Sequence, residues 1–411
     1  MVKNIIQTLF TRGFTAGINF LILIISSKFL GVNTRGEISL FILNIATIQI
    51  ISEIYTGSSI VYFVPKFNLK KMYLYGIIWT MAACAVSNGV LFLIHKEMTA
   101  FESDLFILSV LIILNTFNNV IILAKENIKL FNFLGVLQPS ILLIGIFYFT
   151  QIEKDFTFKA YIIPLYISFL VSFVISFTRV FKYISIPDFK TKFSLKSVLE
   201  NGFFCQVAVL LHLLSNRFSF YILGSNALVG LYATASSLME SVWIIANGIT
   251  PIILSKISNT GDTSFTRRIT LTFAKISFLL SCLATVFVWL LPNSLFIYLL
   301  GNNFQETKHL MLFISPGILF ISFSTVISHY FSGLGNLKFI AICNFSGFIF
   351  TLILAPLLIK KYGLHGAAIS ANITYLISSV ALSIGFFVKT KISLLSLFRF
   401  KEDSQNIKEA F

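Results

Sequence analysis

The chain has 411 residues, of which 56% are apolar and only 11% are charged, and its formal net charge is +15. Soluble domains carry about 25% charged residues, so this chain has too few polar side chains to cover a water-facing surface. The composition excludes a soluble enzyme and a protein that binds nucleic acid, and the long apolar runs exclude an outer-membrane barrel. A polytopic helical membrane protein remains.

About twelve apolar segments long enough to cross a bilayer follow one another along the chain. The first six are predicted at 5–30, 38–64, 72–95, 104–124, 133–152 and 159–181. A basic linker follows at 182–197, then six more segments at 198–223, 229–254, 269–291, 309–333, 337–359 and 365–388, and a tail at 389–411. The sequence therefore predicts an all-α fold with an N-terminal six-helix bundle (1–181) and a C-terminal one (198–388).

Two short segments resemble each other and occupy equivalent places in the two predicted bundles. Residues 30–40 read LGVNTRGEISL and residues 223–233 read LGSNALVGLYA, and each joins the first and second segments of its bundle. Weak internal symmetry of this kind is common in transporters, which bind substrate near the interface of the two repeats. We therefore expect two pseudo-symmetric bundles around a central cavity.

Basic residues indicate which side of the membrane each loop occupies. With the N-terminus inside, most Lys and Arg residues fall in predicted cytoplasmic segments, above all in the linker and the tail. Because cytoplasmic loops are enriched in Lys and Arg, both termini are predicted to be cytoplasmic. Lys360 and Lys361, in a predicted outer loop, oppose this pattern.

Three basic residues lie well inside predicted spans, away from the span ends, where ionisable groups are costly and mark candidate sites. Arg12 is about two turns into the first span, Arg217 is in the outer third of the seventh, and Lys275 is about two turns into the ninth. An arginine stays charged and binds phosphate bidentately, so these residues predict a cationic cavity for an anionic, phosphate-bearing substrate. For Arg12 and Lys275 the alternative is that the side chain reaches the membrane surface.

Two carboxylates, Glu53 and Glu240, fall near the middle of the second and eighth spans. A buried carboxylate can bind a proton or Na⁺ and so couple transport to an ion gradient. The alternative is a structural partner, and a Glu–Arg pair would be structural and functional at once. The sequence has no phosphate-binding loop for ATP, so an H⁺ or Na⁺ gradient is the energy source we consider, and no cofactor is expected.

Uncharged polar residues recur at helical spacing on several spans and predict a hydrated interior. The residues expected to line it are Asn19, Asn118, Asn216, Asn247 and His329. Stripes of this kind also serve as contacts between packed helices, and a histidine at a span end is often interfacial. Both interpretations stay open at this point.

The chain resembles the polysaccharide-exporter (Wzx-like) flippases of the MATE/MOP superfamily. The resemblance rests on LGVNTRGEISL after the first span, on NRFSFYILGSNALVGLYATASSLMESV at 216–242, and on the segment FSGLGNLKFIAICNFSGFIFTLILAPLLIKKYGLHGAAISANITYLIS at 331–378. The family's usual Asp-Arg pair reads Asn216-Arg217 here. These motifs are structural and point to the superfamily more than to a substrate.

The resemblance implies a transporter and no enzyme. It implies an undecaprenyl-diphosphate-linked oligosaccharide as substrate, flipped by alternating access across a bacterial inner membrane for O-antigen, lipopolysaccharide, capsule or another surface glycan. Membrane lipid, a glycan polymerase and other assembly proteins are the partners that it implies.

Two rival functions remain to be compared with the flippase. A cation-coupled exporter of small organic molecules, from the same superfamily, predicts an acidic residue in the first or seventh span. Those spans carry Arg12 and Arg217 and no central carboxylate, which favours the flippase. An integral-membrane glycan polymerase or ligase needs a sizeable outer loop, which the predicted topology lacks.

Overall fold

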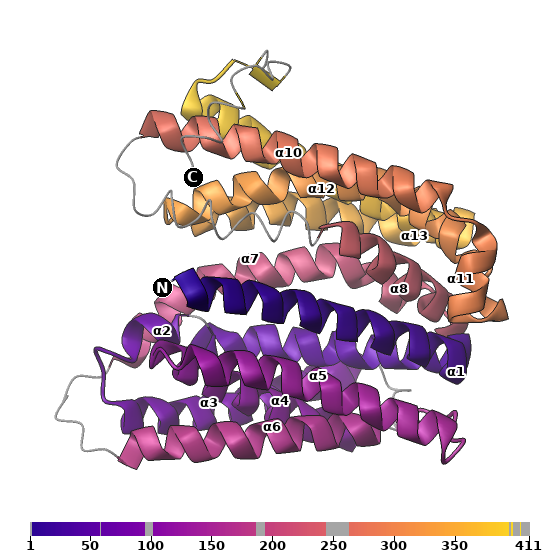
Figure 1. Ribbon diagram of the computed structural model, residues 1–411. Coiled ribbons are helices and arrows are strands. Elements are labelled where there is room, and N and C mark those ends of the chain that lie inside the picture. Colours follow the sequence, from indigo (N-terminus) through magenta and orange to yellow (C-terminus); the bar gives the residue numbers. More distant parts are fainter. Residues whose placement is uncertain are drawn as a thin grey trace. The chain divides into compact units, whose positions relative to one another are not determined.

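The computed structural model describes residues 2–57, 59–94, 102–185, 194–243, 263–393, 396–397 and 403. Every regular element within these ranges is a helix (Figure 1), which confirms the predicted all-α fold. The chain divides into two compact units, Met1–Leu210 and Leu211–Phe411. The division falls inside one helix, α7 (Leu195–Ile222).

The described residues of the N-terminal unit form six helices and the first half of α7. In chain order they are α1 (Val2–Thr56), α2 (Ile60–Phe63), α3 (Leu69–Ile94), α4 (Glu102–Ala124), α5 (Ile128–Gln151) and α6 (Lys159–Ser185). The long helix α1 packs against α3, α4 and α5, and α6 packs against α4 and α5. The helices run lengthwise beside one another within this unit (Figure 1).

Two apolar clusters hold the N-terminal unit together. One gathers Ile38, Leu108 and Ile146, which have no exposed surface, from α1, α4 and α5. The other surrounds Tyr55 and Phe117, which are also fully buried. Many other large apolar side chains are exposed, as expected where lipid and not water faces a helix.

The C-terminal unit begins in α7 and continues through α8 (Asn226–Glu240) and η1 (Ser241–Trp243). It then contains α10 (Thr263–Leu290), α11 (Asn293–Leu300), η2 (Asn302–Phe304), α12 (Thr307–Gly333) and α13 (Leu337–Thr390). Helix α12 is central, because it packs against α8, α10 and α13.

Nine helices in the described parts of the chain are long and apolar enough to cross a membrane. Seven of them hold one predicted span each, and the two that are 54 residues long, at Phe10–Phe63 and Leu337–Thr390, hold two each. The remaining prediction, 229–254, is described as far as Trp243, where α8 and η1 occupy it. The central cavity expected between the bundles stays a prediction.

Five glycines of the described residues have positive φ, and all lie between consecutive spans, Gly301 and Gly335 among them. Gly31 has φ 77°, Gly224 has φ 73° and Gly363 has φ 57°. Only glycine adopts this backbone conformation without a steric cost. Gly31 and Gly224 are the equivalent glycines of the two repeated segments, so the repeat preserves a backbone requirement at the same junction of each unit.

Candidate functional site

The junction between α7 and α8 positions the best-defined polar cluster of the C-terminal unit. Helix α7 ends at Ile222, and the positive φ of Gly224 turns the chain. Ser225 then caps α8, because its side chain accepts a hydrogen bond from the backbone N–H of Leu228 at 3.3 Å. Serine is a favoured residue at this position because it satisfies a free N–H group of the first turn.

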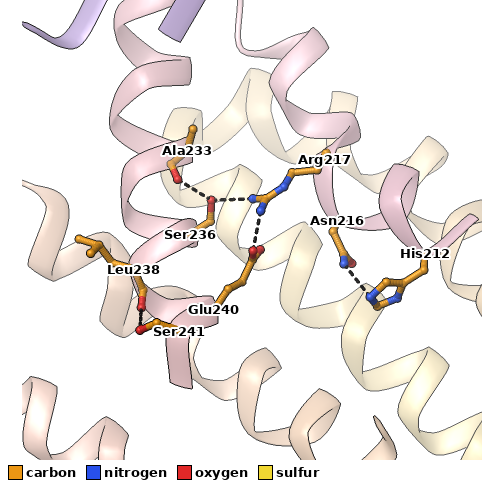
Figure 2. Close-up of polar contacts among 8 residues, drawn as sticks. All are labelled: His212, Asn216, Arg217, Ala233, Ser236, Leu238, Glu240 and Ser241. Atoms are coloured by element: carbon orange, nitrogen blue, oxygen red, sulfur yellow. Dashed lines mark hydrogen bonds and ion pairs between the residues drawn. The ribbon is translucent and has the colours of Figure 1, made fainter. Parts of the chain in front are cut away.

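Arg217 of α7 extends to two side chains of α8 (Figure 2). Its Nη2 lies 2.5 Å from Glu240 Oε2, and its Nη1 donates to Ser236 Oγ at 3.0 Å. Ser236 and Glu240 are four residues apart and therefore share a helix face. The guanidinium also lies 5.1 Å from the ring centroid of Phe220.

The Arg217–Glu240 pair is largely withdrawn from solvent. The two side chains are 18% and 19% exposed, so their attraction is less screened than at a surface. The structure thus joins a predicted substrate-binding cation and a predicted ion-coupling carboxylate in one ion pair. The charge of Arg217 is thus balanced by a carboxylate of the neighbouring helix.

A second group of polar side chains follows Arg217 back along α7. His212 Nε2 and Asn216 Nδ2 are 3.2 Å apart (Figure 2), and the His212 ring lies edge-on to Trp243 at 5.3 Å. Trp243 donates to Thr325 Oγ1 at 2.8 Å, which ties η1 to α12. Within the described part of the chain the buried Oδ1 of Asn216 accepts no hydrogen bond, so this cluster retains one free acceptor beside Arg217.

Glu53, the other predicted coupling carboxylate, lies in a different setting in the N-terminal unit. It accepts a hydrogen bond from Gln49 at 2.7 Å, and among the described residues it has no ion pair. Gly57 leaves room beside it, where a Cβ would meet the amide of Gln206 from α7. Gln206 is 6% exposed, and its Oε1 has no partner in the described ranges. The hydrogen bond of the Glu53 carboxylate is therefore to a neutral amide.

Asn118 lies in a packed network between three helices. It accepts from Tyr73 at 2.9 Å and donates to Ser176 at 3.1 Å, and it has no exposed surface. Ser172 and Ser176 also donate to Asn115. These contacts join α3, α4 and α6, and they fit the helix-packing alternative. A place for Asn118 in a hydrated interior stays a prediction.

Four polar side chains recur on α1 at steps of four, three and four residues, and two of them make contacts while two are exposed. Thr8 accepts from Asn132 at 3.0 Å, and Thr15 donates to the carbonyl of Gly135 at 3.3 Å, both on α5. Arg12 and Asn19 are exposed. Their predicted binding roles remain predictions.

The remaining predicted site residues lie outside these clusters. Lys275 is ion-paired with Asp403 at 2.7 Å. His329 is half-buried on α12, and its Nδ1 has no partner among the side chains described. Asn247 lies outside the described residues. Asp403 and Gln206 were not expected from the sequence, because a carboxylate in a polar tail and a single amide in an apolar span carry no distinguishing pattern.

Comparisons with known proteins agree with this architecture. Residues 204–357 match the MatE family model, and comparison with curated proteins gives no match. An inward-facing multidrug resistance MATE family transporter of the MOP superfamily is 14% identical with a TM-score of 0.71, and 96% of each chain is covered.

Two further solved structures have the same fold. The MATE transporter VcmN of Vibrio cholerae, solved as a point mutant, is 16% identical with a TM-score of 0.66, covering 97% of this chain and 98% of that one. The lipid II flippase MurJ, in an inward closed conformation, is 17% identical with a TM-score of 0.70, covering 100% and 96%. The chain therefore has the fold of MATE/MOP-superfamily transporters.

Proposed function

We propose that this chain is a flippase that moves an undecaprenyl-diphosphate-linked oligosaccharide from the inner to the outer leaflet of a bacterial inner membrane. The observation that carries the proposal is the largely buried pair of Arg217 and Glu240. The substrate class is the lipid-linked repeat unit of O-antigen, lipopolysaccharide or capsule. The expected partner is a glycan polymerase.

Arg217 can exchange the Glu240 carboxylate for another anion. A guanidinium presents five N–H donors in a planar fork that matches phosphate oxygens, and here Glu240 and Ser236 each take one of these donors. A diphosphate that approaches Arg217 competes with Glu240 for the same charge. Whatever weakens the hold of Glu240 on Arg217 therefore favours diphosphate binding, and by linkage this coupling is reciprocal.

Several observations support this proposal. The lipid II flippase MurJ shares the fold over nearly the whole length of both chains. The Oδ1 of Asn216, unpaired among the described residues, is an acceptor beside Arg217 that suits a hydroxyl group of the sugar. Alternating access through a cationic cavity, with both chain termini in the cytoplasm, remains the transport scheme that we propose.

Mass spectrometry of lipid extracts from host cells depleted of this protein tests the function. We expect one undecaprenyl-diphosphate oligosaccharide to accumulate, and wild-type protein supplied from a plasmid to clear it. Arg217→Gln should fail to clear it, whereas Arg217→Lys, which keeps the charge but loses the fork, should clear it in part. Normal clearance by Arg217→Gln would contradict the role of this cation.

A cation-coupled exporter of small organic molecules is the second candidate, and the setting of Glu53 favours it. A carboxylate that is hydrogen-bonded to a neutral amide and has no ion pair in the described ranges can exchange a proton or Na⁺ without breaking a salt bridge. A multidrug MATE transporter also shares the fold. Depletion that raises sensitivity to cationic drugs, with no accumulated lipid intermediate, would support this function in place of the flippase.

A further inference from the structure

The polar tail reaches a buried site on α10. Both oxygens of the Asp403 carboxylate are bound there: Oδ2 lies 2.7 Å from Lys275 Nζ, and Oδ1 accepts from Thr272 Oγ1 at 2.6 Å. Lys275 also donates to the carbonyl of Ser396 at 3.1 Å. Arg267, which precedes Thr272 by about one and a half turns of α10, donates to the carbonyl of Thr390 at 3.1 Å.

The side chains of Thr272 and Lys275 on α10 form a site that is buried and not on the molecular surface. Thr272 and Lys275 are three residues apart and share a face of α10. Thr272 is 1% exposed, and the side chains of Lys275 and Asp403 are 7% and 14% exposed. A lysine so placed needs an anion, because an unpaired charge in this environment is costly.

The Asp403 carboxylate, which occupies the site, belongs to a different segment of the chain from Thr272 and Lys275. Asp403 is 128 residues beyond Lys275 in the chain and follows the last spanning helix, α13. Its carboxylate can therefore leave without any break in α10. Two oxygens on one centre, each taking a separate donor, also occupy the positions that two oxygens of a phosphate group would take.

We propose that Thr272 and Lys275 form a binding site for a phosphate or diphosphate group and that Asp403 is its intramolecular competitor. This inference rests on the proposed transport of a diphosphate-linked lipid, for which the site is an entry point on the predicted cytoplasmic side. Asp403 acts as a tethered ligand at high effective concentration. An anion that binds Lys275 weakly therefore does not displace it.

Binding of inorganic pyrophosphate and of farnesyl diphosphate to the full-length protein in nanodiscs tests the proposal. If the tail occupies the site for about 90–99% of the time, its removal tightens binding by about 10- to 100-fold. We expect this gain in Asp403→Asn and not in Glu402→Gln, which removes the neighbouring charge. The gain should vanish in Asp403→Asn/Lys275→Gln and persist in Asp403→Asn/Arg217→Gln, which separates this site from the Arg217 site.

The two probes distinguish the source of the phosphate. A gain confined to farnesyl diphosphate indicates a lipid headgroup, whereas an equal gain for pyrophosphate indicates a site for free phosphates as well. Equal affinities of Asp403→Asn, Glu402→Gln and the wild type for both probes would overturn the proposal. That result would leave lipid accumulation upon depletion unchanged, so it is distinct from failure of the flippase function.

A measurement on the wild-type protein tests the same competition without any variant that could misfold. Hydrogen exchange of the tail, followed by mass spectrometry, should rise when pyrophosphate is added, because the displaced tail loses its contacts with α10. Sulfate at the same ionic strength is the control for screening. Tail exchange that is unaffected by pyrophosphate at saturating concentration would equally overturn the competition.

Discussion

The Arg217–Glu240 pair provides the sharpest test of whether an ion pair in this protein is structural, functional or both. Three variants are informative: Arg217→Gln, Glu240→Gln and the double variant that carries both changes. Each single change leaves one charge without its partner at a site where the side chains are 18% and 19% exposed. The double change leaves two neutral amides in the same place.

Breaking a buried pair by removing one partner costs about 3–5 kcal/mol, and partial exposure here places the expected cost at about 3 kcal/mol. For a unit of about 200 residues this lowers Tm by roughly 6–12 °C. The double variant should be more stable than either single variant, since a neutral pair pays no desolvation penalty. Thermal unfolding in nanodiscs measures the stability of the three variants. We expect the two single changes to be coupled by about 2 kcal/mol or more in the double variant.

Export should follow a different order from stability. Arg217→Gln and the double variant should both fail to clear the lipid intermediate, because both lack the cation. Glu240→Gln keeps the cation and replaces a charge-assisted bond by a neutral one, a loss of about 1–1.5 kcal/mol, so a diphosphate lipid should bind roughly 5- to 12-fold more tightly. A double variant that is stable and exports normally would refute the substrate-binding role.

Three further predictions address the N-terminal unit. Glu53→Gln should remove the dependence of transport on an H⁺ or Na⁺ gradient, because the amide carries no exchangeable charge; ionophore sensitivity equal to the wild type would contradict this. Asn118→Ala should lower the unfolding free energy by about 2 kcal/mol, because Tyr73 and Ser176 lose partners, while export per folded molecule stays unchanged. Gly202→Ala should prevent folding, since a Cβ there would overlap the backbone carbonyl of Ile54, and membrane-fraction protein levels measure it.

The spans were predictable from the sequence because bilayer thickness fixes the length of an apolar helix. The breaks between joined spans were less obvious, since α1 and α13 continue through Gly31 and Gly363 with a single glycine at positive φ. At Gly31 and Gly224 the sequence did carry a signal, the repeated Leu-Gly-x-Asn segment. Its physical meaning is the backbone conformation that only glycine adopts cheaply.

The members of the polar clusters were predictable, but most of their pairings were not. Helical spacing placed Ser236 and Glu240 on one face of their span. It does not fix the rotation of α7 about its own axis, which decides that Arg217 meets that face. The same limit explains Asn118, whose partners on α3 and α6 lie 45 and 58 residues away.

Each of the two best-placed cations within the C-terminal unit is matched to a carboxylate of the same chain. Arg217 holds Glu240 and Lys275 holds Asp403, and every side chain of the two pairs is less than one-fifth exposed. A membrane protein that binds an anion only part of the time must balance its cations when the substrate is absent, because bare charges there are costly. An internal carboxylate meets this need and is weaker than a diphosphate, which carries more charge. In the proposed function, exchange of a carboxylate for the substrate's diphosphate would keep each cation paired while substrate enters and leaves.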